Sequence, residues 1–326
     1  MTYSPPFHLS EKVVNLTADI AESVGLISAS LGEDLLHPQL RKENRIKTIQ
    51  SSLAIENNTL TLEQVTAILD GKRVLGSPQE IQEVKNAFET YELLLKFNPF
   101  SEQDLLLAHQ ILMKELVNNS GKFRNKSVGI SDGNRIIHVA PPFDRVPFLV
   151  NDLLEWVETS QLHPLIKSCV FHYEFEFIHP FSDGNGRMGR LWQTLILTKW
   201  NTIFAWLPVE TIVKENQTEY YQSLQLADNL GDSATFIEFM LQSILQAVNE
   251  LKKDQNVGVN VGVNVGVNEK TILDLITLKP AITAKEISLQ LKMSIRQTER
   301  YLASLKDKGC IVREGADKNG AWKIIE

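Results

Sequence analysis

The chain has 326 residues, of which 43% are hydrophobic and 22% are charged, and its formal net charge is −7. This composition is typical of a soluble protein with two or three domains, and the acidic balance argues against a protein that coats nucleic acid with its whole surface. The sequence has no run of about 18 apolar residues and no basic-then-apolar leader, so we expect no membrane contact and a cytoplasmic location. Cys169 and Cys310 lie far apart among apolar neighbours, and we expect two buried thiols.

Helical patterns dominate the chain up to residue 254. In residues 37–56 apolar side chains recur at broadly helical spacing, and Pro38 suits a first turn. The next segment, 60–71, has Thr61 as an N-cap, with Glu63 close to capping-box spacing. Further helical patterns occupy residues 77–97, 101–116, 146–160, 163–177, 190–200, 220–230 and 233–253.

Residues 121–143 interrupt the helical pattern. An Asp-Gly-Asn turn at 132–134 separates two short β-prone runs, and two prolines follow at 141 and 142. This arrangement predicts a β-hairpin. The fold class expected for this part of the chain is therefore mainly α, with one hairpin in a helical domain.

A low-complexity segment then divides the protein. From Asn256 a four-residue unit of Asn, Val and Gly is repeated three times, which predicts a linker over 255–268. Its valines leave partial strand pairing as an alternative.

The tail, 269–326, has a pattern of its own. One helix runs to about Leu278, a second is capped by Thr283, a third runs from Ser294 to Gly309, and an alternating segment then predicts a hairpin. Helix, helix, helix and hairpin resemble a winged helix-turn-helix domain.

The charge of the tail differs from that of the rest of the chain. It carries 11 Lys and Arg against 8 Asp and Glu, a net +3, so the first 268 residues carry −10. In a winged helix, Arg296, Gln297 and Arg300 would lie on the recognition helix and Lys318 on the wing, which makes DNA a candidate partner. A protein-docking or dimerising module fits the same pattern, and a modest excess of three charges does not decide between them.

The stretch FIHPFSDGNGRMGR, residues 177–190, joins a helix end to a helix start. Pro180 prevents simple continuation of the preceding helix, and the next helix begins near Gly186. The glycines let successive backbone N–H groups turn inward. A loop of this kind at a helix N-terminus is an anion site.

Four side chains in this stretch suit phosphate chemistry. Arg187 and Arg190 share one face of the first helical turn, where guanidinium groups can bind phosphate oxygens. Asp183 is a hard oxygen ligand suited to Mg²⁺, and His179 has a reference pKa near neutrality, as a general base requires. Each residue alone is more often a turn, cap or surface residue, so the prediction depends on the ordered set.

The ordered set resembles the Fic family signature HPFx(D/E)GNGRxxR, and the resemblance extends from about Lys42 to Leu251. It implies a Fic-type helical domain whose hairpin is the flap. It also implies AMP transfer from ATP to a Ser, Thr or Tyr hydroxyl of an unidentified target protein, the enzyme itself included. Every specified position is filled, by His179, Pro180, Phe181, Asp183, Gly184, Asn185, Gly186, Arg187 and Arg190.

The same resemblance implies roles for individual residues. His179 would be the general base, and Asp183 would bind Mg²⁺ as cofactor. Tyr220 and Tyr221 would line the adenine pocket, with packed core aromatics as the alternative. The other predicted nucleotide contacts come from the phosphate loop and the flap, and the two flap residues would also align the target segment. These are Gly184, Asn185, Gly186, Arg187, Arg190, Ile137 and His138.

A second pattern, SSLAIENN at 51–58, matches the inhibitory signature (S/T)xxxE(G/N) of the same family. Ser52, Glu56 and Asn57 fill the specified positions. The resemblance implies that Glu56 pairs with Arg190 and so opposes productive ATP binding. The same glutamate could instead orient a water that removes AMP, and the sequence does not separate the two.

Four segments follow from these patterns. Residues 1–100 form an N-terminal helical region with the inhibitory motif, 101–254 the Fic catalytic domain, 255–268 the linker and 269–326 the winged helix. Alternative functions are a bifunctional enzyme that also removes AMP, a DNA-binding regulator, and a relative that uses another donor. A metal hydrolase is disfavoured, because further ligands at metal-site spacing are missing. A homodimer stays open.

Overall fold

The structure, a computed structural model, describes residues 3–31, 38–132, 135–256, 267–291, 293–307, 310–314 and 320–324. The chain divides into two compact units, Met1–Asn249 and Glu250–Glu326. Within the described residues, helices form most of the fold and strands form only two short hairpins, which confirms the expected mainly α class. None of the helices in these ranges combines the length and the apolar character that crossing a bilayer requires.

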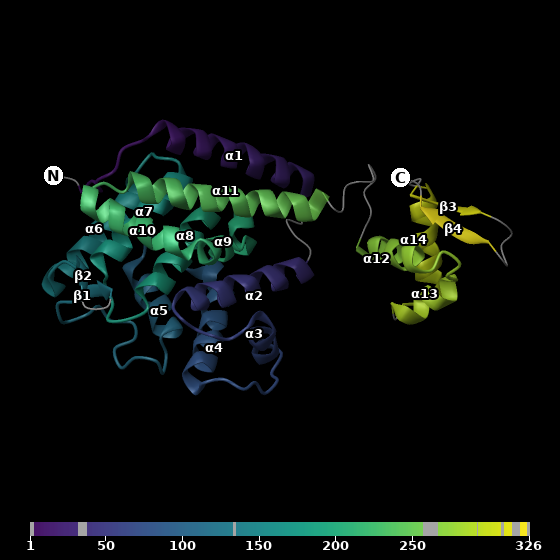
Figure 1. Ribbon diagram of the computed structural model, residues 1–326, viewed down its shortest axis with the longest axis horizontal. Coiled ribbons are helices and arrows are strands. Elements are labelled where there is room, and N and C mark those ends of the chain that lie inside the picture. The colour runs from purple at the N-terminus through teal and green to yellow at the C-terminus, as the bar shows by residue number, and fades with distance from the viewer. Residues whose placement is uncertain are drawn as a thin grey trace. The chain divides into compact units, whose positions relative to one another are not determined.

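The first unit is an assembly of helices with one hairpin at its edge (Figure 1). In chain order its elements are α1 (Glu11–Leu31), α2 (Pro38–Ile55), α3 (Leu62–Leu69), α4 (Pro78–Glu92), η1 (Leu94–Lys96), α5 (Glu102–Leu112), β1 (Gly129–Asp132), β2 (Arg135–Val139), η2 (Phe143–Arg145), α6 (Val146–Thr159), α7 (Pro164–Ile178), α8 (Asn185–Trp200), η3 (Thr202–Trp206), α9 (Val209–Glu215), α10 (Gln217–Leu230) and α11 (Ala234–Asn256).

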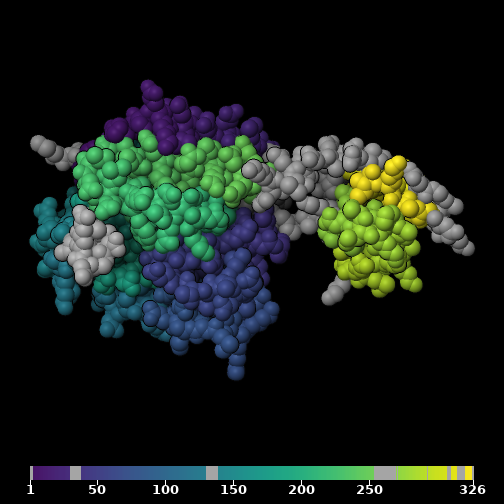
Figure 2. Space-filling view, in the orientation of Figure 1, coloured from purple at the N-terminus to yellow at the C-terminus, as the bar shows by residue number. Residues whose placement is uncertain are grey.

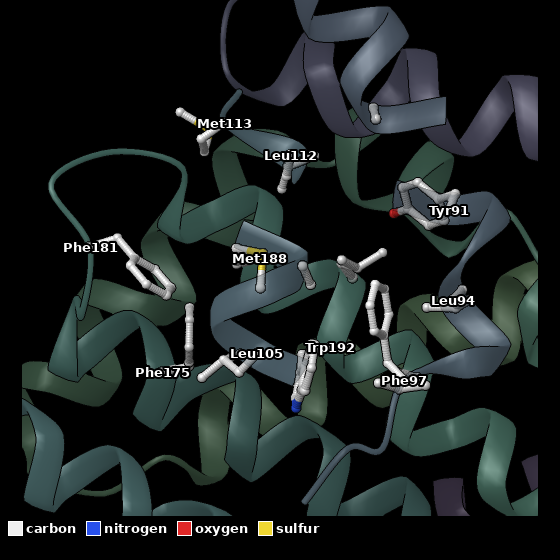
Figure 3. Packing of buried hydrophobic residues seen from close by; sticks show 14 of the residues in the cluster. Tyr91, Leu94, Phe97, Leu105, Leu112, Met113, Phe175, Phe181, Met188 and Trp192 are labelled. Atoms are coloured by element: carbon white, nitrogen blue, oxygen red, sulfur yellow. The ribbon is translucent and has the colours of Figure 1, made fainter. Parts of the chain in front are cut away.

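Helices α7 and α8 form the centre of this unit and pack against each other. Nearly every residue of α8 is buried, although the helix contains several polar side chains. Figure 3 shows its apolar side chains, Met188 and Trp192, among aromatic and aliphatic residues of the surrounding helices. The indole N–H of Trp192 donates to the carbonyl of Pro99 at 2.9 Å. The helix that carries the signature is therefore held on all sides by the core.

Short-range caps start several helices, as the sequence predicts. Ser77 and Glu80 form a capping box at α4. The box at α3 joins Thr61 to Gln64, so the expectation that Glu63 takes this place is wrong. Position N3 is the one whose side chain reaches back to the cap, and Glu63 lies one residue too early.

The hairpin pairs β1 with β2 in antiparallel register, with Gly129 opposite Val139 and Ile130 opposite His138. The register shifts between Ile130 and Ser131, at the level of Ile137. Such a bulge bends the strand and increases its local twist.

Helix α1 was not among the predicted elements. Its buried residues repeat at helical spacing and lie on one face: Val13, Leu16, Ile20, Val24 and Ile27. Both views place α1 along α11 (Figures 1 and 2), and the Ser10 hydroxyl before α1 donates to Glu238 of α11 at 2.6 Å. The N-terminal segment is therefore packed as part of the first unit.

The second unit contains the predicted order of three helices and a hairpin. Its own core is formed by apolar residues such as Ile276, Ile287 and Leu305. Cys169 in the first unit and Cys310 in this one are both buried, as expected. The elements are α12 (Val267–Leu278), α13 (Ala284–Gln290), α14 (Ile295–Asp307), β3 (Ile311–Glu314) and β4 (Ala321–Ile324).

Candidate functional site

The signature occupies the loop between α7 and α8 and the first turns of α8. His179 ends α7 in the left-handed region, with φ 50° and ψ 59°. Gly184 begins α8, also left-handed at φ 83°. A side chain at Gly184 would bring its Cβ within 2.6 Å of the Met113 sulfur, so both conformation and space require glycine. The loop between α7 and α8 therefore begins and ends at residues with a fixed, left-handed backbone conformation.

Asn185 holds this loop closed. Its side-chain oxygen accepts from the backbone N–H of Phe181 at 2.9 Å, and its side-chain nitrogen donates to the Phe181 carbonyl at 3.0 Å. The side chain is buried. Its carboxamide therefore serves the loop itself, and the part of Asn185 suited to an anion is its backbone at the start of α8.

His109 of α5 supports the same loop and was not singled out from the sequence. Its Nδ1 accepts from the backbone N–H of Gly121 at 2.8 Å, so its Nε2 carries the proton and donates to the Asp183 carbonyl at 3.1 Å. The imidazole also stacks on Phe181, with ring centroids 3.6 Å apart. Burial lowers the pKa of His109 to about 4. A histidine in an apolar helical pattern was the only signal available.

Asp183, in the loop, and Arg187, in the first turn of α8, form an ion pair. The Asp183 carboxylate accepts from the Gly184 N–H at 2.6 Å and from Arg187 Nη2 at 3.2 Å, and its side chain is 57% exposed. Groups of three or more potential metal ligands are absent from the described residues. An exposed single carboxylate beside an anion site still fits Mg²⁺, because this ion is commonly held by one or two carboxylates together with substrate phosphates.

Arg187 has a second carboxylate partner that the sequence did not indicate. Its Nη1 lies 3.5 Å from Glu83 of α4. Glu83 in turn accepts from the side chain of Asn58 at 2.8 Å. Asn58 directly follows the inhibitory motif, so this motif is linked to Arg187 through Glu83.

Arg190 donates hydrogen bonds to two residues of the motif at 51–58, Ser52 and Glu56. Its Nη2 donates to Glu56 at 2.8 Å and to the Ser52 carbonyl at 3.0 Å, and its Nε donates to the Ser52 hydroxyl at 3.1 Å. The Arg190 side chain is 2% exposed. Burial by itself lowers the pKa of Arg190, but the nearby Glu56 carboxylate reverses this, and the pKa lies above its usual value. The pairing expected from the sequence is present in the structure.

Two residues set the position of Glu56. Asn57 has φ 69°, the left-handed conformation that commonly ends a helix, and it turns the chain just after α2. Gly186 faces the carboxylate, because a Cβ there would overlap Glu56 and approach Arg190. The glutamate thus lies directly over the first turn of α8.

The two tyrosines of α10 are placed differently. Tyr221 is half-exposed, and its hydroxyl donates to the Ile55 carbonyl at 3.3 Å, beside Gln217, which donates to the same oxygen at 2.9 Å. Tyr220 is buried, and its hydroxyl lies 3.1 Å from Nε2 of His172. Tyr220 is a packed core aromatic in this structure, whereas Tyr221 lies beside the C-terminal end of α2.

The remaining predicted residues lie elsewhere. Ile137 and His138 belong to β2, and their side chains lie outside what the structure describes. Arg296 and Arg300 are exposed on α14 in the second unit. Gln297 is also exposed, but its side-chain oxygen accepts from the N–H and hydroxyl of Ser294, so it caps the helix. Lys318 lies outside the described residues.

Comparisons with known proteins agree on one family. A profile of the Fic/DOC family matches residues 99–197. A crystal structure of a Fic family protein from Desulfovibrio desulfuricans G20 has a TM-score of 0.78 and 46% identity, covering 99% of this chain and 98% of that chain. Fic-1 from C. elegans has a TM-score of 0.61 and 23% identity, covering 76% and 74%, a likeness of fold alone.

Two curated relatives match a shorter part of the chain. Protein adenylyltransferase Fic of Aedes aegypti is 32% identical over 211 residues, which covers 61% of this chain and 40% of that protein. Protein adenylyltransferase fic-1 of Caenorhabditis elegans is 31% identical over 214 residues, covering 62% and 40%. The chain therefore spans about 40% of the length of these curated relatives. With the complete signature folded into one loop, and a solved structure 46% identical over nearly all of both chains, this chain belongs to the Fic family.

Proposed function

We propose that the chain is a protein adenylyltransferase, which transfers AMP from ATP to a hydroxyl of a target protein and restrains itself through Glu56. One observation carries the proposal. Asp183, Arg187 and Arg190 lie at the N-terminal end of α8, one short loop away from His179 at the end of α7, and both arginines bind carboxylates that phosphate oxygens can replace. The names of the curated relatives support the same activity.

The reaction would proceed by positioning and charge neutralisation. The triphosphate would lie on the backbone N–H groups at the start of α8, with Arg187 and Arg190 on its phosphate oxygens. A target Ser, Thr or Tyr oxygen attacks the α-phosphorus and gives its proton to His179, while the bond to the bridging oxygen breaks and pyrophosphate leaves. Mg²⁺ held by Asp183 would neutralise phosphate charge when bound.

The contact between Glu56 and Arg190 supplies the restraint. A γ-phosphate can bind Arg190 only when the Glu56 carboxylate moves away from it. If the carboxylate remains in place, its negative charge repels the incoming triphosphate. Release of the brake should therefore raise AMP transfer.

The test uses α-labelled ATP and magnesium with cell lysate. We expect strong labelling by the Glu56→Gly variant, weak labelling by the unaltered chain and none by the double variant that adds His179→Ala. Mass spectrometry of labelled bands identifies donor, target and residue. Equal labelling by the unaltered chain and Glu56→Gly would contradict the brake. AMP loss from a labelled target that requires Glu56 would instead indicate removal.

DNA binding by the second unit is a second candidate function. The exposed Arg296 and Arg300 on α14 favour it, because basic residues on the third helix of such a domain reach the groove. We expect the double change Arg296→Ala and Arg300→Ala to weaken binding to duplex DNA and to reduce its salt dependence. His179→Ala should leave this binding intact, so the two functions separate. Binding that is absent at low salt would favour a protein-docking module.

A further inference from the structure

Arg124 lies between α5 and β1 and is buried, with 3% of its surface exposed. Its guanidinium donates to four backbone carbonyls. Nε donates to His179 at 2.8 Å, Nη1 to Lys126 at 2.9 Å, and Nη2 to Pro141 at 2.5 Å and to Ile178 at 3.3 Å. The three guanidinium nitrogens thus donate in different directions, to carbonyls that belong to three separate segments of the chain.

Two of these carbonyls come from the two ends of the hairpin. Lys126 precedes β1 and Pro141 follows β2. A two-stranded hairpin is marginally stable by itself. Because one rigid guanidinium holds both ends, the position of the hairpin is fixed relative to Arg124.

The other contacts belong to the end of α7. The last carbonyls of a helix lack partners within the helix, and a cation there is favourable. Ile178 and His179 present two such carbonyls to Arg124, while the backbone N–H of Arg124 donates to the Pro180 carbonyl at 2.9 Å. His179 itself has the left-handed conformation, which is sterically unfavourable for a residue with a Cβ. Arg124 stabilises the turn in which this histidine lies.

We propose that Arg124 is a positioning residue that fixes the hairpin and the backbone of His179 to each other, so that a target segment and the imidazole keep one relative placement. This inference rests on the proposed function, because it assigns the histidine to the reaction and the hairpin to the target. It adds a residue outside the signature whose effect falls on the chemical step.

The geometry separates this role from nucleotide binding. The phosphate contacts proposed above come from α8, and the described hydrogen bonds of Arg124 go to none of its residues. A displaced imidazole should therefore slow transfer while ATP binding stays nearly unchanged. Misplacement of a catalytic group by about 1 Å can cost about 100-fold in rate.

The test introduces Arg124→Lys into the Glu56→Gly protein. Lysine keeps the charge, but its single nitrogen cannot replace three guanidinium nitrogens that donate in different directions. We expect kcat for AMP transfer to fall about 10- to 100-fold, with KM for ATP within about threefold. Arg145→Lys is the matched control, because Arg145 is an exposed arginine in η2, a few residues after Pro141. It should change neither constant.

Two further measurements keep the test decisive. Hydrogen exchange of peptides spanning 125–141 should become at least about tenfold faster in Arg124→Lys, while peptides from α8 stay protected. In Arg124→Ala, added methylguanidinium should restore transfer, whereas methylammonium should not. The exchange result needs no activity, so it decides the inference even if no AMP is transferred. Unchanged kcat with unchanged exchange would overturn the inference, as would a KM increase that alone explains the loss.

Discussion

Replacing Glu56 by Gln tests the contact that restrains the proposed site. The change keeps the shape of the side chain and a hydrogen-bond acceptor 2.8 Å from Arg190, but it removes the negative charge. Arg190 keeps its two bonds to Ser52. Any effect therefore measures the charge of one carboxylate over the first turn of α8.

The magnitude follows from geometry and exposure. Two unit charges about 4 Å apart interact by about 4 kcal/mol at an effective dielectric constant of about 20. The Glu56 side chain is 32% exposed, and solvent screening lowers this value. We take about 2 to 3 kcal/mol, so ATP should bind about 30- to 150-fold more tightly once the competing charge is gone.

Stability should change in the opposite direction. Without ATP, the variant leaves a buried Arg190 charge uncompensated, and the free energy of unfolding should fall by about 1 to 2 kcal/mol. With ATP at 100 times its Kd, binding restores about 2.7 kcal/mol. The variant should thus be less stable than the unaltered chain when free, and gain more from the nucleotide.

The assay compares proteins that both carry His179→Ala, so that no ATP is consumed. Calorimetric titration gives Kd, and urea unfolding with and without ATP gives stability. Glu43→Gln is the matched control, because Glu43 is exposed on the same helix and bonds Gln39 rather than an arginine. A Glu56→Gln protein that is folded but binds ATP within about threefold of its parent would refute this reasoning.

Two further predictions concern residues that hold the loop. For His109, burial lowers the folded-state pKa to about 4 from 6.5, so as pH falls below 6.5 the unfolded state binds a proton first and stability is lost down to pH 4. His109→Gln should reduce the slope of unfolding free energy against pH in this window by up to about 1.4 kcal/mol per pH unit, measured by urea unfolding, and an unchanged slope would contradict the buried neutral imidazole. Asn185→Ala should cost about 2 to 4 kcal/mol, because it leaves the N–H and carbonyl of Phe181 without partners. Asn185→Asp, which can still accept, should cost less than alanine in the same experiment, and equal losses would contradict the two-bond description.

Local interactions made much of this fold readable from sequence. Caps such as Ser77 and the helix stop at Pro180 act over a few residues, so the element order and the loop before α8 follow from short segments. Interactions confined to neighbouring residues depend little on the rest of the chain. The helical period of α1 was equally present in the sequence, and the Ser10 hydroxyl accepts from its first turn. Its contact with α11, by contrast, depends on packing.

The family resemblance supplied the pairing of Glu56 with Arg190, which lie 134 positions apart. Packing decided the partners for which the sequence offered no pattern. His109 reaches the Asp183 carbonyl and Arg124 reaches the His179 carbonyl only because α5, the hairpin and the end of α7 are brought together. The same packing buries Tyr220. Every residue has the same backbone carbonyl, so the sequence does not indicate which side chain will donate to a given carbonyl. The sequence by itself determined which residues form the loop between α7 and α8, and the tertiary structure decided which distant side chains hold that loop in place.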